Sequence, residues 1–329
     1  MAPIPIDPRP SDFSRFRSHT IAATTEGEVT WDPPGAGKTC KTWYRLRGNL
    51  TYGGRPLVIL HGGPGVGHDY LSSLEDLAIS YNIPVVLYDQ LGCGRSTHLP
   101  EKRGDATFWR VGLFLEELEN LLRHLGIEKN YDLLGNSWGG MLAAEHAARR
   151  PRGLNRLVVA DAPASIASWV RAANRLRKEL PEDVQEALRR HEEEKTTDSQ
   201  EYEEAMMVFY RRHVCRLENW PKEVQRSFQN IKDDPTVYYT MNGPSEFHIT
   251  GTLKDWSILS DLPKIDVPTL LINGRYDEAT HDVVEPYFQK IQKCKWVTFE
   301  NSSHMPHVEE RGRFMEVVGG FLRGENMRT

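Results

Sequence analysis

The stretch that decides the fold is YDLLGNSWGG, residues 131–140. An apolar run leads into a Gly-x-Ser-x-Gly pattern, and a run of helix formers follows at 141–148. This order predicts a strand, a tight turn and a helix, with the hydroxyl of Ser137 exposed on the turn. Gly135 and Gly139 leave room for such a turn, because glycine has no Cβ. We therefore predict that Ser137 is a nucleophile.

Composition limits the classes of protein that the chain can represent. It has 329 residues, of which 39% are hydrophobic and 26% charged, with a net charge of −5. The length fits one large α/β domain with an insertion, and the mild charge favours neither nucleic acid nor an anionic membrane as partner. Residues 1–8 lack the basic and apolar regions of a secretory signal, and no apolar run reaches the length of a membrane span. We expect a cytoplasmic protein; its oligomeric state stays open.

The cysteines predict no metal site. Cys40, Cys93, Cys215 and Cys294 lack the spacing of metal ligands, and in a cytoplasmic chain they are expected to be free thiols. Neither a metal nor an organic cofactor is expected. Cys93 lies close to the predicted site, so we hypothesise that mercurials or maleimides block access by labelling it; a buried, inert thiol is the alternative.

Several short apolar runs predict strands that are buried on both faces. They lie at 56–60, 84–88, 157–160, 268–272 and 295–299. Apolar residues between 108 and 125 recur at helical spacing, and 28–48 reads as a β-hairpin. Strands that alternate with helices imply a mainly parallel sheet covered on both sides, the doubly wound α/β class.

The alternation of strands and helices stops after residue 160 and resumes near 267. The charge-rich segment between these points is predicted to be helical and to sit over the carboxyl ends of the strands, where such folds bind ligands. The expected organisation is an N-terminal extension at 1–27, a core at 28–162 and 262–329, and a helical cap at 163–261.

A serine nucleophile needs a base and a carboxylate that orients the base. In α/β-hydrolases these groups follow in the order serine, acid, histidine. Asp277 comes after the strand at 268–272, and His304 comes after the strand at 295–299. Position therefore selects Asp277 and His304. The alternatives are Glu278 or Asp282 as the acid and His307 as the base.

Backbone N–H groups are expected to form the oxyanion hole. One belongs to Trp138, the residue after the nucleophile, and the other to Gly63 or Gly62 in the loop HGGPG at 61–65. A second glycine-rich loop, GCGRS at 92–96, invites a phosphate-binding interpretation. It lacks the remaining features of the dinucleotide fingerprint, so we reject that interpretation.

Three motifs together resemble the proline iminopeptidase family, including its L-amino-acid amidase and tricorn-interacting aminopeptidase relatives. They are HGGPG at 61–65, DQLGCGRS at 89–96 and GNSWGG at 135–140; MNGPSEF at 241–247 and GRYDEAT at 274–280 resemble the same family. The resemblance covers about residues 28–323. It implies an α/β-hydrolase core with a helical cap, and release of an N-terminal residue or an amino-acid amide. The implied residues are Ser137, Asp277 and His304, with oxyanion amides from Gly63 and Trp138.

One position departs from the family pattern. Many members that prefer proline have Arg where this chain has Leu91, so the resemblance does not imply a strict preference for proline. Related fungal hydrolases act on small natural products, which leaves an esterase, amidase or lactonase as the alternative function. A binding protein without activity is disfavoured by the intact serine, acid and base. An epoxide hydrolase or dehalogenase would need a carboxylate in place of Ser137.

An enzyme that selects a free amino terminus needs a carboxylate in the cap. Glu246 resembles the family's amine-binding glutamate, and Glu218 is our candidate for the second. Glu203 and Glu204 are weaker candidates, which we interpret as part of a solvated helix face. Aromatic residues could line a pocket for an apolar side chain, although most are expected to pack in the cap core. They are Phe209, Tyr210, Trp220, Tyr238, Tyr239, Phe247 and Trp256.

Overall fold

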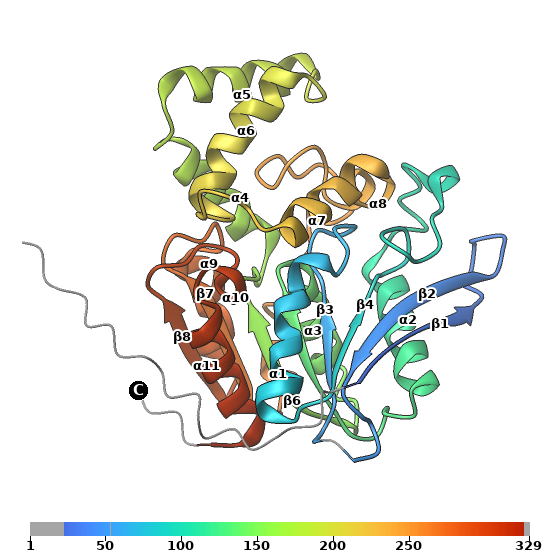
Figure 1. The fold of residues 1–329 in the computed structure, drawn as a ribbon. Coiled ribbons are helices and arrows are strands. Elements are labelled where there is room, and N and C mark those ends of the chain that lie inside the picture. The colour runs from blue at the N-terminus through green and yellow to red at the C-terminus, as the bar shows by residue number, and fades with distance from the viewer. Residues whose placement is uncertain (1–22, 53, 326–329) are drawn as a thin grey trace, which may run out of the picture.

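A central sheet of eight strands, in the order β1-β2-β4-β3-β5-β6-β7-β8, organises the molecule (Figure 1). The computed structural model describes residues 23–52 and 54–325. The strands are β1 (Thr24–Trp31), β2 (Cys40–Arg47), β3 (Leu57–Leu60), β4 (Val85–Tyr88), β5 (Tyr131–Asn136), β6 (Leu154–Ala160), β7 (Thr269–Gly274) and β8 (Cys294–Phe299). β1 and β2 form an antiparallel hairpin, β2 pairs antiparallel with β4, and the remaining pairs are parallel. The predicted mainly parallel sheet is confirmed.

Helices cover both faces of the sheet, which explains why its central strands are wholly apolar. In β3, Val58 and Leu60 pack with α2 and α3, whereas Leu57 and Ile59 pack with α1 and α11 on the opposite face. Such alternation follows from the two-residue period of a strand. The core helices are α1 (Asp76–Tyr81), α2 (Val111–His124), α3 (Trp138–Ala148), α9 (His281–Lys290), α10 (Pro306–Glu309) and α11 (Arg311–Arg323), with the 3₁₀ segments η2 (Asp69–Glu75), η3 (Pro100–Lys102) and η4 (Leu262–Lys264).

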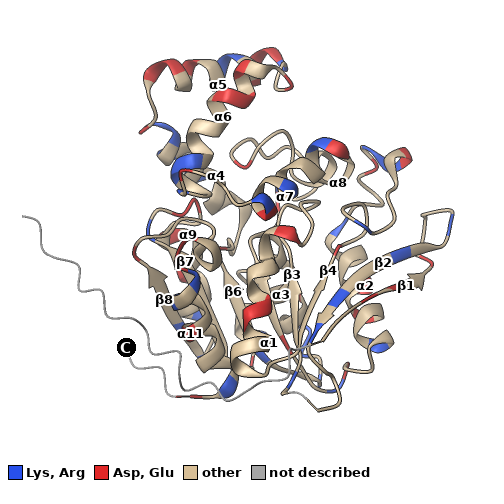
Figure 2. Ribbon diagram, in the orientation of Figure 1, with Lys and Arg blue, Asp and Glu red and all other residues tan. Residues whose placement is uncertain are grey.

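The segment between β6 and β7 is helical. It contains α4 (Ile166–Arg177), α5 (Glu182–Glu194), α6 (Gln200–His213), α7 (Lys222–Asp233) and α8 (Thr236–Met241). Hydrogen bonds from Ile166 to Trp256 and from Ile258 to Ala164 close the segment at its base. α5 and α6 lie farthest from the sheet (Figure 1) and contain many charged residues (Figure 2). We call residues 163–261 the cap.

The hairpin starts earlier than the sequence indicated, because β1 begins at Thr24 rather than at Glu28. Residues 1–22 of the expected N-terminal extension, and 326–329 at the other end, lie outside the described residues. Among the helices that the structure describes, none combines the length and apolar character that a membrane crossing requires.

Candidate active site

Ser137 stands on the turn between β5 and α3. Its backbone has φ 56° and ψ −126°, in the positive-φ region that non-glycine residues rarely adopt, and its N–H donates to the Ala160 carbonyl at 2.9 Å. A Cβ on Gly135 would lie 2.0 Å from the Gly139 carbonyl oxygen, and a Cβ on Gly139 would lie 2.0 Å from the Leu60 carbonyl oxygen. The Gly-x-Ser-x-Gly pattern is therefore required by the close approach of α3 to β3 and β5.

His304 and Asp277 form the hydrogen bond that a base and its orienting acid require. Nδ1 of His304 lies 2.7 Å from Oδ1 of Asp277, and both side chains are buried. Asp277 comes from the loop after β7, and His304 from the loop after β8. Burial opposes a positive charge on His304, but the Asp277 carboxylate, together with Glu246 and Glu309, outweighs it, so the pKa of His304 is raised. With Nδ1–H donated to Asp277, Nε2 is left to accept a proton.

The structure does not bring Asp282 or His307 into this arrangement. Asp282 is exposed and pairs with Arg175 at 2.8 Å. His307 is buried, and its Nε2–H donates to the Tyr70 carbonyl at 3.2 Å. Burial lowers the pKa of His307 to about 3, so the ring is neutral and structural.

Ser137 and His304 line one cavity of about 510 Å³ between the cap and the sheet. Apolar and aromatic side chains form much of its wall, including Val66, Met206, Tyr210, Tyr238 and Tyr239. Of the other aromatic residues considered from the sequence, Phe209 and Phe247 are buried against each other in the cap core. Leu91 is fully buried and does not line the cavity. The volume is within the usual range for sites that take small molecules.

The loop at 61–65 borders the nucleophile closely. A Cβ on Gly62 would lie 3.0 Å from the Cβ of Ser137. The N–H of Gly62 donates to the Tyr70 hydroxyl at 2.8 Å, whereas that of Gly63 has no hydrogen-bond partner in the described part of the chain. Trp138 is the first residue of α3, where N–H groups have no partner within a helix. Among the residues that the structure describes, Gly63 and Trp138 therefore keep N–H groups available for the predicted oxyanion hole.

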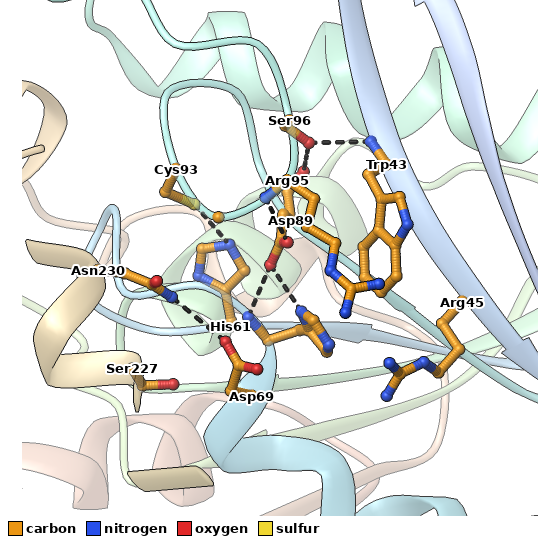
Figure 3. A network of polar contacts seen from close by, with 12 residues as sticks. Trp43, Arg45, His61, Asp69, Asp89, Cys93, Arg95, Ser96, Ser227 and Asn230 are labelled. Atoms are coloured by element: carbon orange, nitrogen blue, oxygen red, sulfur yellow. Dashed lines mark hydrogen bonds and ion pairs between the residues drawn. The ribbon is translucent and has the colours of Figure 1, made fainter. Parts of the chain in front are cut away.

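The motif at 89–96 forms hydrogen bonds with the loop at 61–65, which we call the oxyanion loop, and with His68 just after it (Figure 3). The Asp89 carboxylate accepts hydrogen bonds from the backbone N–H and Nδ1 of His68 and from the N–H of Arg95. Gln90 accepts a hydrogen bond from the Trp138 indole at 2.8 Å and donates one to the His61 carbonyl at 3.0 Å. Gln90 therefore ties the start of α3 to the loop that carries Gly63.

His61, Asp89 and Cys93 lie within metal-ligating distance of one another. The Nε2 lone pair of His61 already accepts the Gln90 N–H at 3.0 Å, and the Asp89 carboxylate already accepts three hydrogen bonds, so these residues do not fit a metal. Cys93 is fully buried, and burial raises the pKa of its thiol well above the usual value. The hypothesis that reagents reach Cys93 is therefore wrong for the folded protein; all four cysteines are free.

Two carboxyl groups face the cavity beside the triad. Glu246 accepts a hydrogen bond from the Tyr238 hydroxyl at 2.6 Å. Glu278 is buried, its Oε1 lies 4.0 Å from Nε2 of His304, and its Oε2 has no partner among the described residues. Burial raises the pKa of both carboxyls, and the charges of Glu246 and Asp277 raise that of Glu278 further. An unpartnered buried carboxyl oxygen that lines a cavity calls for a cationic or donating ligand.

Glu218 is exposed and does not line the cavity, so our candidate for the second amine ligand is not supported. Glu203 lies at the cavity wall but forms an ion pair with Lys232, and Glu204 is exposed. From the sequence, Glu278 is only an alternative triad acid. Its position directly after Asp277, within GRYDEAT, is the sequence feature that could have placed it at the cavity.

Sequence reasoning also missed Trp169 of α4. Its indole N–H donates to the Glu246 carbonyl at 2.6 Å, and its ring meets that of His304 edge-on, with centroids 5.9 Å apart. Trp169 therefore contacts both the base and the segment that carries Glu246.

An elbow serine that is buried but lines the cavity, a buried histidine–aspartate pair and two backbone amides without partners, set on this sheet, define a serine hydrolase of the α/β-hydrolase fold.

Comparisons with known proteins agree with this class. The alpha/beta hydrolase fold family matches residues 55–311. A proline iminopeptidase of Saccharolobus solfataricus is 41% identical over 85% of this chain and 87% of its own, and one of Heyndrickxia coagulans is 38% identical over 82% and 91%. The crystal structure of VinJ is 51% identical, with a TM-score of 0.86 over 91% of this chain and 99% of its own. The proline iminopeptidase of Mycobacterium smegmatis is 41% identical, with a TM-score of 0.81 over 91% and 98%. The chain belongs to the proline iminopeptidase family.

Proposed function

We propose that this serine hydrolase releases an apolar N-terminal residue, proline among them, from small peptides or amino-acid amides. The observation that carries the proposal is the pair of carboxyl groups, Glu246 and Glu278, that face the cavity beside His304. A protonated amino terminus would donate to both and would satisfy the unpartnered oxygen of Glu278. A substrate whose amine is held there would present its first peptide carbonyl to Ser137, which lines the same cavity.

The mechanism follows from the geometry. Ser137 attacks the carbonyl carbon while Nε2 of His304 takes the hydroxyl proton, and the amides of Gly63 and Trp138 bind the oxyanion. His304 then gives the proton to the leaving amine, and the C–N bond breaks to leave an ester on Ser137. Water, activated by His304, hydrolyses that ester. Asp277 keeps the proton of the neutral imidazole on Nδ1 throughout.

The experiment compares Glu246→Gln and Glu278→Gln with the parent enzyme on two substrates. These are an amino-acid p-nitroanilide with a free amine and p-nitrophenyl acetate, which has none. Each charge-assisted hydrogen bond contributes about 1.5–3 kcal/mol, so each variant is expected to lose about ten- to a hundred-fold in kcat/KM on the anilide. The loss on the ester is expected to be much smaller.

Glu218→Gln is the matched control, because that glutamate is exposed and lies outside the cavity wall. Equal losses on both substrates would show that the two glutamates support the triad and not the amine. Activity on N-acetylated but not on free-amine anilides would overturn the proposal.

The cavity of about 510 Å³ also supports a second candidate, an esterase, amidase or lactonase for a small natural product. The two buried carboxyls argue for an amine-bearing substrate in either case. A cytoplasmic location, proposed from the sequence, is tested by fractionation of cells that express the chain.

A further inference from the structure

Asp161 is a second buried acid next to the triad. It follows the last residue of β6 directly, has φ 54° and is fully buried. Its N–H donates to the Ile272 carbonyl at 2.8 Å. Ile272 belongs to β7, the strand that leads to Asp277, so the backbone places the two aspartates at the same edge of the sheet.

The hydrogen bonds of the two aspartates leave one oxygen on each without a partner. Oδ2 of Asp161 accepts a hydrogen bond from Nδ2 of Asn136 at 2.9 Å, and Oδ1 of Asp277 accepts from His304 and from the N–H of Ala279. Oδ1 of Asp161 and Oδ2 of Asp277 are both buried and have no partner among the other described groups. Among the charged groups around it, the Asp277 carboxyl acts most strongly on Asp161, so the two carboxyl groups lie close to each other.

Two carboxylates cannot accept from each other, whereas one proton between them satisfies both oxygens. Asp277 already has two N–H donors, including that of His304, so it is the one better stabilised as an anion. Asp161 has the single Asn136 donor. Burial, and then the charge of Asp277, raise the pKa of Asp161 well above its usual value, and Glu309 of α10 acts in the same direction. The proton therefore belongs on Asp161.

We propose that Asp161 is a positioning residue for the triad: as a neutral carboxylic acid it donates a hydrogen bond from Oδ1 to Oδ2 of Asp277. Asp277 is then fixed through both of its oxygens, and its Oδ1 stays aimed at Nδ1 of His304. This inference rests on the triad proposed above but not on the choice of an amine-bearing substrate.

The same proton completes a directed chain that starts in the oxyanion loop. The N–H of Gly62 donates to the Tyr70 hydroxyl at 2.8 Å, and that hydroxyl donates to Oδ1 of Asn136 at 2.7 Å. Asn136 donates to Asp161, and Asp161 donates to Asp277. Every donor points toward the buried anion, so each bond polarises the next. Asn136, directly before the nucleophile, thereby links the oxyanion loop to the triad acid.

The test compares Asp161→Asn with Asp161→Leu, two neutral side chains of similar size. The Asn carboxamide can accept from Asn136 and donate to Asp277, whereas Leu can do neither. With p-nitrophenyl acetate, and with kcat expressed per serine titrated by an organophosphate, Asp161→Leu is expected to lose about ten- to a hundred-fold in kcat with little change in KM, the loss of one or two such hydrogen bonds. Asp161→Asn is expected to recover most of that loss.

The pH profile of kcat/KM distinguishes a neutral Asp161 from an ionised one. The informative part is its acid limb, where kcat/KM falls as the pH drops. If Asp161 is neutral, Asp161→Asn removes no charge near His304, and the midpoint of the limb stays where it is in the parent enzyme. A midpoint that moves to lower pH by about one unit or more would overturn the proposal, as would an Asp161→Leu variant with parental kcat.

Infrared spectroscopy provides a readout that needs no turnover. The parent protein is expected to show the C=O stretch of a buried, protonated carboxylic acid that disappears in Asp161→Asn. If this band is unchanged in the variant, Asp161 is not the protonated group and the proposal fails. An inactive parent enzyme on the ester, with the band present, would instead count against the proposed hydrolase activity alone.

Discussion

His304 combines burial with a raised pKa, and these normally oppose each other. Burial alone would keep the imidazole neutral, but Asp277 on the Nδ1 side, and then Glu246 and Glu309, favour its charged form. The negative surroundings stabilise the imidazolium that forms when Ser137 attacks. They also set the pH range in which the enzyme works.

This arrangement predicts the pH dependence of the reaction. His304 must be neutral to accept the serine proton, and its pKa is raised from 6.5. We expect kcat/KM on a neutral ester to fall as the pH drops, with a midpoint above 6.5. For a free-amine substrate the fall should be steeper, since Glu246 and Glu278 have raised pKa values and lose their charge as well. Ester activity that stays constant through pH 6.5 would contradict this assignment.

At the scale of single elements, α2 carries a fully buried acid, Glu117. Its carboxyl lies 2.5 Å from the Thr42 hydroxyl and accepts the Leu91 N–H at 3.1 Å, so it anchors the start of the loop at 89–96. Burial raises the pKa of Glu117 to about 8. The native state therefore holds this proton more tightly than the unfolded chain does.

The consequence for stability has a definite sign. Between pH 4.5 and about 8 the folded state binds more protons at Glu117 than the unfolded state, so this group's contribution to the free energy of unfolding falls as pH rises. Glu117→Gln keeps one donor and one acceptor but does not titrate. We expect denaturant unfolding to show a flatter decline of stability over this range in the variant. Parallel curves for the two proteins would contradict the prediction.

The elements themselves were predictable where burial leaves a pattern. Strands covered on both faces read as apolar runs, and β3 to β8 lie at or near the predicted ranges. The start of β1 was missed because Thr24–Glu26 are exposed on an edge strand, where no apolar alternation is required. The proposed triad could be named from the sequence because each member follows a strand whose end the fold fixes.

The roles of Glu278, Trp169 and Asp161 could not be read in the same way. Each depends on which direction a side chain takes after folding: Glu278 enters the cavity, Trp169 contacts His304, and Asp161 meets Asp277. Glu218 illustrates the converse, since a charge in a helical cap gives no sign of whether it faces solvent or a ligand.

At the scale of the whole molecule, the cap and the core meet at the site through Trp169. The indole joins the segment of Glu246 to the face of His304, so the position of the cap and the geometry of the base are linked. A ligand that moves Glu246 therefore acts on a residue that also touches His304, the proposed base.

Trp169→Phe tests this link. Phenylalanine keeps an aromatic ring beside His304 but loses the hydrogen bond to the Glu246 carbonyl. A net hydrogen bond contributes about 0.5–1.5 kcal/mol, so we expect kcat/KM on a free-amine anilide to fall about two- to tenfold more than on p-nitrophenyl acetate. A uniform loss on both substrates would show that the indole serves His304 alone.

Asp277 and Glu278 are consecutive residues whose side chains have different roles. That of Asp277 bonds to His304, and that of Glu278 lines the cavity. One short loop thus holds both the acid that orients the base and a carboxyl proposed to select the substrate. An insertion or a shift in this loop alters both tasks together, whereas the Glu246 side chain in the cap can be replaced without changing the loop that holds Asp277. We therefore expect substrate preference in such an enzyme to change mainly through substitutions in the cap. Redesign of its specificity should start there.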